Sequence, residues 1–248
     1  MSASIKAGLN NDMHLMTDGV TRAYVDGNGK VGIGTTSPSK KFVVSEGGVH
    51  GFEISPYDGS QNATRLINYN RSTNACFPLE IEASQIAFET NGSEKMRIDP
   101  SGYVTTPNQP SFLAGMSAPQ SLVHATMTKV QFNQSVEQTG SNFSTSNYRF
   151  TCPVAGRYLF NWHVYVYPVK NMESKLYKNG SSLIRIASPE NYQDVNPHGS
   201  GGSVILQANA NDYFEIYAAG YHSSGSGSSV YHGSGAERAS SFSGMLIG

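Results

Sequence analysis

Hydrophobic and polar residues alternate with a period of two over much of this chain, which is typical of β-strands with one buried face. The clearest run covers residues 158–167 and ends at Pro168. Its even positions are apolar, namely Tyr158, Phe160, Trp162, Val164 and Val166. Apolar residues at the three-four spacing of a helix, behind a capping residue, are almost absent. The alternation therefore predicts an all-β protein.

Shorter patterns predict further strands and a turn. Residues 79–83 alternate between apolar and small or acidic side chains, and residues 86–88 resume the alternation in the opposite phase. This predicts a strand over 79–83 and a turn or bulge near residues 84–85. Asn179 and Gly180 stand between two strand-like runs. Because both residues tolerate positive φ, this pair predicts a hairpin.

An internal repeat divides the first half of the chain. Thr-Asp-Gly at residues 17–19 recurs as Thr-Asn-Gly at 90–92, and the segment 25–31 recurs as 98–104, with an offset of 73 in both cases (90 − 17 and 98 − 25). Each copy reads strand, turn, strand, turn, strand. So small a unit cannot bury one face by itself. We therefore expect these units to pack against other copies of the chain.

Composition and charge exclude several classes of protein. The 248 residues carry 17 Lys and Arg against 18 Asp and Glu, a net charge of -1. A disordered chain would carry more charge and fewer than 38% hydrophobic residues, and a nucleic-acid binder would need a basic patch. No apolar run approaches the roughly 18 residues of a membrane helix, and the N-terminus lacks an apolar signal core. We predict no nucleic-acid partner and no membrane insertion.

The sequence carries no recognisable catalytic or metal-binding motif. Cys76 and Cys152 lie far apart, and each is predicted to be a small buried hydrophobe. Residues 32–34 read Gly-Ile-Gly but do not continue into a dinucleotide-binding fingerprint, and no nucleophile elbow or P-loop occurs. Glu80 and Glu82 are expected to form a solvated strand face. We therefore predict no enzyme, no cofactor and no metal site.

One short motif carries a first resemblance. Gly-Ile-Gly-Thr-Thr-Ser-Pro at residues 32–38 follows an Asp-Gly-Asn-Gly turn and resembles a junction motif of bacteriophage tail-fibre proteins, whose shafts and knobs are intertwined trimers. The second repeat departs from it and reads as a linker at residues 105–110. The resemblance implies an attachment or shaft segment at 1–40 and a central β shaft or knob at 41–110. It also implies a protein of the virion, made in the host cytoplasm.

A second resemblance covers residues 111–248, which we call the head. Glycine and aromatic residues there fall at the spacing of the complement C1q globular-head signature, although Gln138 and Trp162 depart from its pattern. The matching residues are Phe132, Phe143, Phe150, Gly156, Tyr158 and Phe160. The resemblance implies a jelly-roll sandwich like that of tumour necrosis factor, assembled as a homotrimer.

The odd positions of the run 158–167 are too apolar for a fully wetted face. We predict that Leu159, Tyr165 and Tyr167 contact neighbouring subunits of the trimer. The alternative is an ordinary surface sheet with scattered tyrosines.

The order of strands predicts which loops point away from the fibre. If each strand crosses the head once, the turns at 153–156, 179–180 and 209–212 share one end with residue 110 and the C-terminus. The opposite, distal end then holds the connections 133–147, 168–172, 188–202 and 220–239. Loops there are rich in rings, amides and carboxylates, which suit a glycan, although solvated loops without a ligand remain the alternative. The predicted receptor-binding residues are Tyr192, Asp194, His198, Tyr221, His222, Tyr231 and His232.

Together, the two resemblances imply a bacteriophage tail fibre. Its N-terminal region would bind other virion tail or baseplate proteins. Its head would trimerise and bind a glycan or protein of the host cell surface, with three tips raising avidity. Two alternatives remain open: a virion decoration or assembly protein without receptor binding, and a non-viral C1q-like adhesin.

Overall fold

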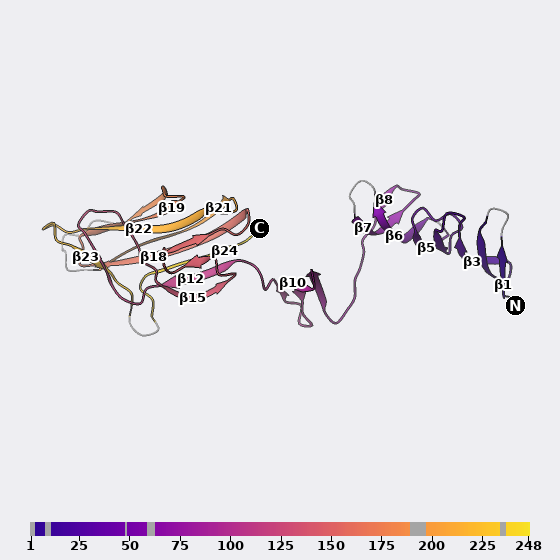
Figure 1. Cartoon of the computed structure of the whole chain (residues 1–248), viewed down its shortest axis with the longest axis horizontal. Coiled ribbons are helices and arrows are strands. Elements are labelled where there is room, and N and C mark those ends of the chain that lie inside the picture. The colour runs from indigo at the N-terminus through magenta and orange to yellow at the C-terminus, as the bar shows by residue number, and fades with distance from the viewer. Residues whose placement is uncertain (1–2, 8–10, 48, 59–62, 189–196, 234–236) are drawn as a thin grey trace. The chain divides into compact units, whose positions relative to one another are not determined.

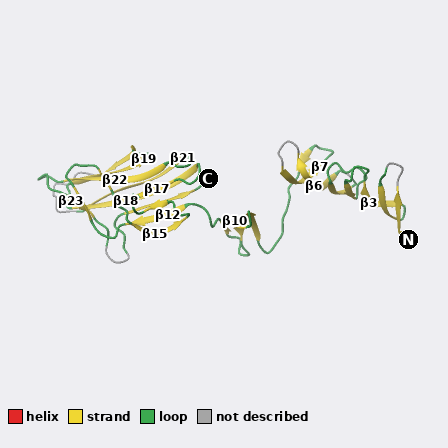
Figure 2. Cartoon of the chain, viewed as in Figure 1, coloured by secondary structure: helices red, strands yellow, loops and turns green. Residues whose placement is uncertain are grey.

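The computed structural model covers the whole chain and describes residues 3–7, 11–47, 49–58, 63–188, 197–233 and 237–248. The described residues form strands and loops, and none of them forms a helix that could cross a membrane (Figure 2). The chain divides into two compact units, Met1–Ala83 and Ser84–Gly248. The all-β prediction is confirmed.

The first unit is a single sheet whose strands follow one another in chain order. The pairing is antiparallel except between β4 and β5, which run parallel. The strands are β1 (Ala3–Ala7), β2 (Met13–Thr17), β3 (Val20–Val25), β4 (Val31–Ile33), β5 (Phe42–Glu46), β6 (His50–Asp58), β7 (Ala63–Asn70) and β8 (Ala75–Cys76).

The second unit begins with a small sheet and continues into a two-layer sandwich (Figure 1). The small sheet holds β9 (Ile86–Thr90), β10 (Ser93–Ile98) and β11 (Val104–Thr105). The first layer, the β18 sheet, holds β12 (Ser111–Gly115), β13 (Gln120–Leu122), β15 (Gln134–Thr139), β18 (Gly156–Tyr167), β21 (His198–Ala208), β23 (Ser228–Val230) and β24 (Ser241–Leu246). The second layer, the β22 sheet, holds β14 (Thr128–Lys129), β16 (Phe143–Ser144), β17 (Arg149–Thr151), β19 (Asn171–Lys178), β20 (Ser181–Ala187) and β22 (Tyr213–Tyr221).

An aromatic core fills the space between the two layers of the head. The five even positions predicted from Tyr158 to Val166 are all buried, while the odd positions of β18 are partly or fully exposed. Phe160 lies among the rings of Phe150, Phe214 and Phe242, with centroids 4.3 to 6.0 Å away. The period-two pattern therefore identified the buried face of the longest strand correctly.

The internal repeat is a structural repeat. Strands β9, β10 and β11 begin 73 residues after β2, β3 and β4, and their pairing registers keep the same offset. The hairpin residues Asp18 and Asn91 both have positive φ. In the second turn, the Asp26 carboxylate accepts the backbone N–H groups of residues 28 and 30, as Asp99 does with residues 101 and 103. We call each three-stranded copy a module.

The order of strands places most of the predicted turns as expected. Asn179 and Gly180 both have positive φ and close the β19–β20 hairpin. The Leu246 N–H donates to the Pro110 carbonyl, and the Cys152 N–H donates to the Asp212 carbonyl. The tight turns therefore lie at the same end of the head as residue 110 and the C-terminus. In Figure 1, β23 lies at the opposite, distal end.

The placement of the connection 133–147 at the distal end was wrong. Residues 134–139 form β15, which runs back along β12 until Thr139 pairs with Ser111, next to residue 110. The prediction assumed a single crossing between Phe132 and Phe150. An additional edge strand reverses the direction and brings the following turn to the near end.

Residues 77–83 form no strand within the described part of the chain. The alternation of 79–83 predicted one, whereas β9 starts at Ile86 as the resumed phase indicated. The predicted domain division at residues 40 and 110 stays a prediction. The sheet of the first unit continues across residue 40, because β4 pairs with β5.

Asp212 should make the head sensitive to acid. Hydrogen bonds from Lys178, Asn179 and the Asn209 N–H lower the pKa of its carboxyl from 3.8 to about 2. A lowered folded-state pKa stabilises the fold above the unfolded value and loses that effect as the pH falls through the folded value. Between pH 4 and pH 2, Asp212→Asn should therefore lose less stability than the wild type in denaturant unfolding. Glu237→Gln, at an exposed carboxylate of the same unit, should follow the wild type.

The two cysteines should differ in reactivity. Cys152 is fully buried, and burial raises the pKa of its thiol to about 12, whereas Cys76 is exposed, contrary to the prediction that both are buried. Because the thiolate is the reactive species, Cys152 should be inert in the folded protein. A thiol-titrating disulfide reagent should count one thiol per native chain and two after denaturation. Two reactive thiols in the native chain would contradict the buried position of Cys152.

Candidate assembly and receptor-binding surfaces

The outer face of the β18 sheet carries the predicted trimer contacts. Leu159, Tyr165 and Tyr167 occupy odd positions of β18, so they lie on the face opposite the aromatic core. Leu159 and Tyr165 are half-buried, and Tyr167 is exposed. The structure therefore brings all three residues to one face of one strand.

An apolar row crosses this face. The registers place Met245 of β24 beside Leu159 of β18, and Leu159 beside Ile205 of β21. Met245 is 43% exposed and Ile205 is 51% exposed. Directly paired side chains on one sheet face lie in contact distance of one another. The Leu159 row, as we call these three residues, is a continuous apolar strip without a cover among the described residues.

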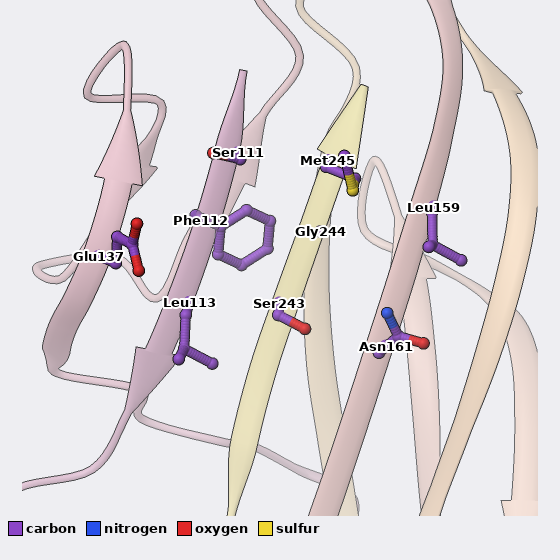
Figure 3. A pocket seen from close by; sticks show the side chains of 9 residues that line it. All are labelled: Ser111, Phe112, Leu113, Glu137, Leu159, Asn161, Ser243, Gly244 and Met245. Atoms are coloured by element: carbon purple, nitrogen blue, oxygen red, sulfur yellow. The ribbon is translucent and has the colours of Figure 1, made fainter. Parts of the chain in front are cut away.

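A shallow groove of about 240 Å³ lies beside this row (Figure 3). Its walls come from four neighbouring strands, with Leu113 on β12, Glu137 on β15, Ser243 on β24 and Asn161 on β18. Leu113 and Leu159 supply apolar surface, while Ser243 between Leu113 and Asn161, together with Glu137 and Asn161, supplies polar groups. Protein–protein interfaces combine apolar and hydrogen-bonding groups in this way.

Gly244 lies on the central strand of this groove and faces the aromatic core beneath it. It pairs with Phe112 on one side and Phe160 on the other. A Cβ atom at residue 244 would lie 2.6 Å from Cδ1 of Phe160 and 2.9 Å from Cε1 of Phe112. Only glycine therefore lets both core rings lie flush under the sheet.

The distal part of the same face is partly covered by the chain itself. The Tyr165 N–H donates to the Ser240 hydroxyl at 3.0 Å, and the Tyr231 N–H donates to the Tyr165 carbonyl at 2.7 Å. The Tyr165 ring lies 6.4 Å from the Tyr231 ring and 6.2 Å from the His163 ring. Tyr165 thus connects the predicted interface to the predicted receptor-binding residues.

Of the predicted receptor-binding residues that the structure describes, Tyr231 is the most exposed. It is 42% exposed, and its ring lies 5.6 Å from that of His232. His198 begins β21 and pairs with Val166, near the distal end of the head. Tyr192 and Asp194 lie outside the described residues. The structure thus brings Tyr231 and His232 together and places His198 on a different strand.

The other predicted pair, Tyr221 and His222, belongs to a second cluster. The Tyr221 hydroxyl donates to Glu173 at 3.0 Å, and the His222 N–H donates to His124 Nδ1 at 3.1 Å. The His124 ring also lies edge-on to the Tyr221 ring, at 6.3 Å. Tyr221 therefore packs within the distal end, through its contacts with Glu173 and His124, as well as presenting part of its ring.

Sequence reasoning missed the partners of this cluster. Glu173 is buried with Lys175, Arg185 and the Tyr221 hydroxyl around its carboxylate. Burial acts to raise the pKa of the Glu173 carboxyl, but hydrogen bonds from Tyr221 and Arg185 together lower it. His124 comes from a loop that the pattern left unassigned. Lys175 is close to Glu173 in sequence, but Arg185 and Tyr221 reach it from 12 and 48 residues away, so no local signal could have identified the cluster.

Each module carries an apolar face at equivalent positions. In the first module the register aligns Met13, Val25 and Val31 across three strands. In the second it aligns Ile86, Ile98 and Val104, each 73 residues later. Among the described residues from 3 to 110, Val43 is the only buried aliphatic or aromatic side chain apart from the prolines at 38 and 110. The module faces therefore lack a hydrophobic core of their own.

The described residues hold no group of three His, Cys, Asp or Glu side chains arranged around a common metal position. The surfaces above offer apolar strips, aromatic rings and hydrogen-bonding groups. Chemically, they suit binding and assembly.

Comparison with known proteins gives a family match for the head. The model of the C1q domain family matches residues 111–247. The globular domain of zebrafish complement 1qA is 18% identical, with 56% of this chain and 98% of that chain covered and a TM-score of 0.42. Eiger TNF from S. frugiperda is 12% identical, with 56% and 92% covered and a TM-score of 0.43. Murine APRIL is 12% identical, with 56% and 99% covered and a TM-score of 0.40.

Proposed function

The chain belongs to the C1q domain family, and we propose that it is a homotrimeric bacteriophage tail-fibre protein whose head assembles the trimer and binds the host surface at its distal end. The predicted C1q-like jelly-roll head is confirmed by this membership. Proteins of the C1q and tumour necrosis factor fold form homotrimers and bind receptors. The tail-fibre role rests on the motif at residues 32–38 and on the modules that precede the head.

The observation that carries the trimer is the uncovered apolar surface along the chain. The Leu159 row and the two module faces expose apolar side chains at positions set by strand register. Buried apolar surface is the main source of folding free energy, and residues 3–110 have almost none within one described chain. Two further copies of the chain would supply the missing cover.

Sedimentation of the purified full chain tests this assembly. We expect a single species of three chains, each of 26.7 kDa, that does not dissociate on dilution. A stable folded monomer would contradict the proposal.

Host binding is assigned to the distal end because its loops combine exposed rings with hydrogen-bonding groups. Tyr231 offers a ring that can stack on a sugar face, and the imidazole of His232 lies next to it. A glycan is the class of receptor that this combination of groups fits best. Three tips on one fibre would turn weak contacts into strong attachment.

Adsorption to host cells tests receptor binding. Labelled wild-type protein should bind cells of the host or their purified envelope glycans, and Tyr231→Ala should weaken this binding at unchanged sedimentation. Tyr103→Ala is the matched control, since Tyr103 is also an exposed tyrosine but lies before the head. A trimer that binds no cells or glycans would instead be a virion decoration or assembly protein.

The location in the virion is tested separately. An antibody against the head should label the tails of intact phage particles. Labelling of a cell surface in the absence of any particle would indicate a non-viral C1q-like adhesin.

A further inference from the structure

Residues 79–83 have the pattern of a strand but no strand partner within the described part of their unit. The sequence Leu-Glu-Ile-Glu-Ala alternates, with Leu79 49% exposed and Ile81 62% exposed. The last ties to the sheet come just before: the Phe77 N–H donates to the Asn68 carbonyl, and the Asn68 side chain donates to the Pro78 carbonyl. Beyond Pro78, Leu79 and Ile81 are exposed, and no described residue of the unit pairs with this segment as a strand.

The regions on both sides of this segment carry uncovered apolar faces. One module lies in the unit that contains the segment, and the second module begins at Ile86. If copies of the chain cover these faces, as the proposed trimer requires, three copies of residues 79–83 are held near one another from both sides. Such tethering gives a high effective concentration, so weak contacts between the segments would form.

We infer that residues 79–83 of the three chains associate as a short interchain β segment, with Leu79 and Ile81 facing the common axis and Glu80 and Glu82 facing solvent. This inference rests on the proposed trimer. Alternating positions of an extended strand point to opposite sides, so one side is apolar and the other acidic. The opposite phase would place two carboxylates from every chain beside the axis, where unpaired charges are costly to bury.

Single cysteine substitutions at successive positions test whether the side chains of 79–82 alternate between the axis and solvent. In the full-length chain with Cys76→Ser, each of Leu79→Cys, Glu80→Cys, Ile81→Cys and Glu82→Cys is oxidised and run on a non-reducing denaturing gel. A cysteine near a threefold axis can form one disulfide between two chains. We therefore expect a band of twice the single-chain mass for Leu79→Cys and Ile81→Cys, and only the single-chain band for Glu80→Cys and Glu82→Cys.

Two results would overturn the inference. Equal cross-linking at all four positions would show a linker without a fixed facing, and absence of cross-links at 79 and 81 would show that the segments lie apart. A short bismaleimide repeats the experiment for pairs too far apart for a disulfide.

Sedimentation of the same samples separates this inference from the proposed function. A trimer without the alternating cross-links would refute the interchain segment but not the proposed trimer. A monomer would refute the proposed trimer as well.

Discussion

Phe160→Ala is expected to lower the free energy of unfolding of the head by about 3–5 kcal/mol, the usual cost of deleting a buried ring. Phe160 is fully buried, and its centroid lies 4.3 Å from that of Phe214 and 6.0 Å from that of Phe242. Gly244 leaves no Cβ beside this ring, so the neighbouring strand already lies close to it. The surrounding rings can therefore collapse only partly into the cavity.

The single tryptophan makes this measurement specific to the head. Trp162 is 4% exposed, and its indole N–H donates to the Ser174 hydroxyl at 2.9 Å. Its fluorescence should report denaturant unfolding of the sandwich, with both proteins measured at one concentration because assembly stabilises the folded state.

Leu183→Ala is the matched control for the core substitution. Leu183 is exposed on β20, so its truncation should change the unfolding free energy by less than about 0.5 kcal/mol. A loss below about 1 kcal/mol for Phe160→Ala would contradict a closely packed aromatic core.

Local patterns predicted the parts of this fold that depend on neighbouring residues. The buried face of β18 follows from alternation alone, since a strand turns successive side chains to opposite faces. The hairpin at Asn179 follows from a pair of residues that tolerate positive φ. The modules follow from a repeat without gaps, whose offset is kept by every pairing register.

Pairing between distant strands could not be predicted in the same way. The edge strand β15 returns along β12 because of contacts between residues about 25 positions apart, and nothing local in 134–139 marks that partner. The cluster of His124, His222 and Tyr221 depends on a still longer separation. All seven predicted receptor-binding residues stay predictions, and two of them, Tyr192 and Asp194, lie outside the described residues.

Residues 79–83 have a strand pattern but form no strand in the described chain. Alternation states that a segment can form a strand, whereas a strand needs a partner for its backbone hydrogen bonds. A strand pattern that stays unpaired in one described chain can therefore indicate a partner strand in another chain. The module faces support the same conclusion, because none of their apolar side chains is buried in either copy of the repeat.

Leu159→Arg should dissociate the proposed trimer while leaving the head folded. Leu159 stands in the middle of its row, between Met245 and Ile205, and points away from the aromatic core. Burial of a leucine is worth about 1.5–3 kcal/mol, and an arginine there would place an unpaired charge at each of the contacts between chains. Together these effects should raise the dissociation constant roughly 100-fold or more, since each 1.4 kcal/mol is tenfold.

Sedimentation over a dilution series measures this change on the full chain. The wild type should stay at three chains of 26.7 kDa, and Leu159→Arg should shift toward the single chain as the concentration falls. Trp162 fluorescence should still show a folded head, because the arginine side chain extends from the outer face.

Leu183→Arg places the same charge on the other sheet. Leu183 is 49% exposed on β20, so this variant should keep the mass of the wild type. If both arginine variants stay trimeric, the outer face of the β18 sheet is not the contact between heads, and the module faces alone would have to hold the chains together. If only Leu159→Arg dissociates, the contact between heads runs through the Leu159 row.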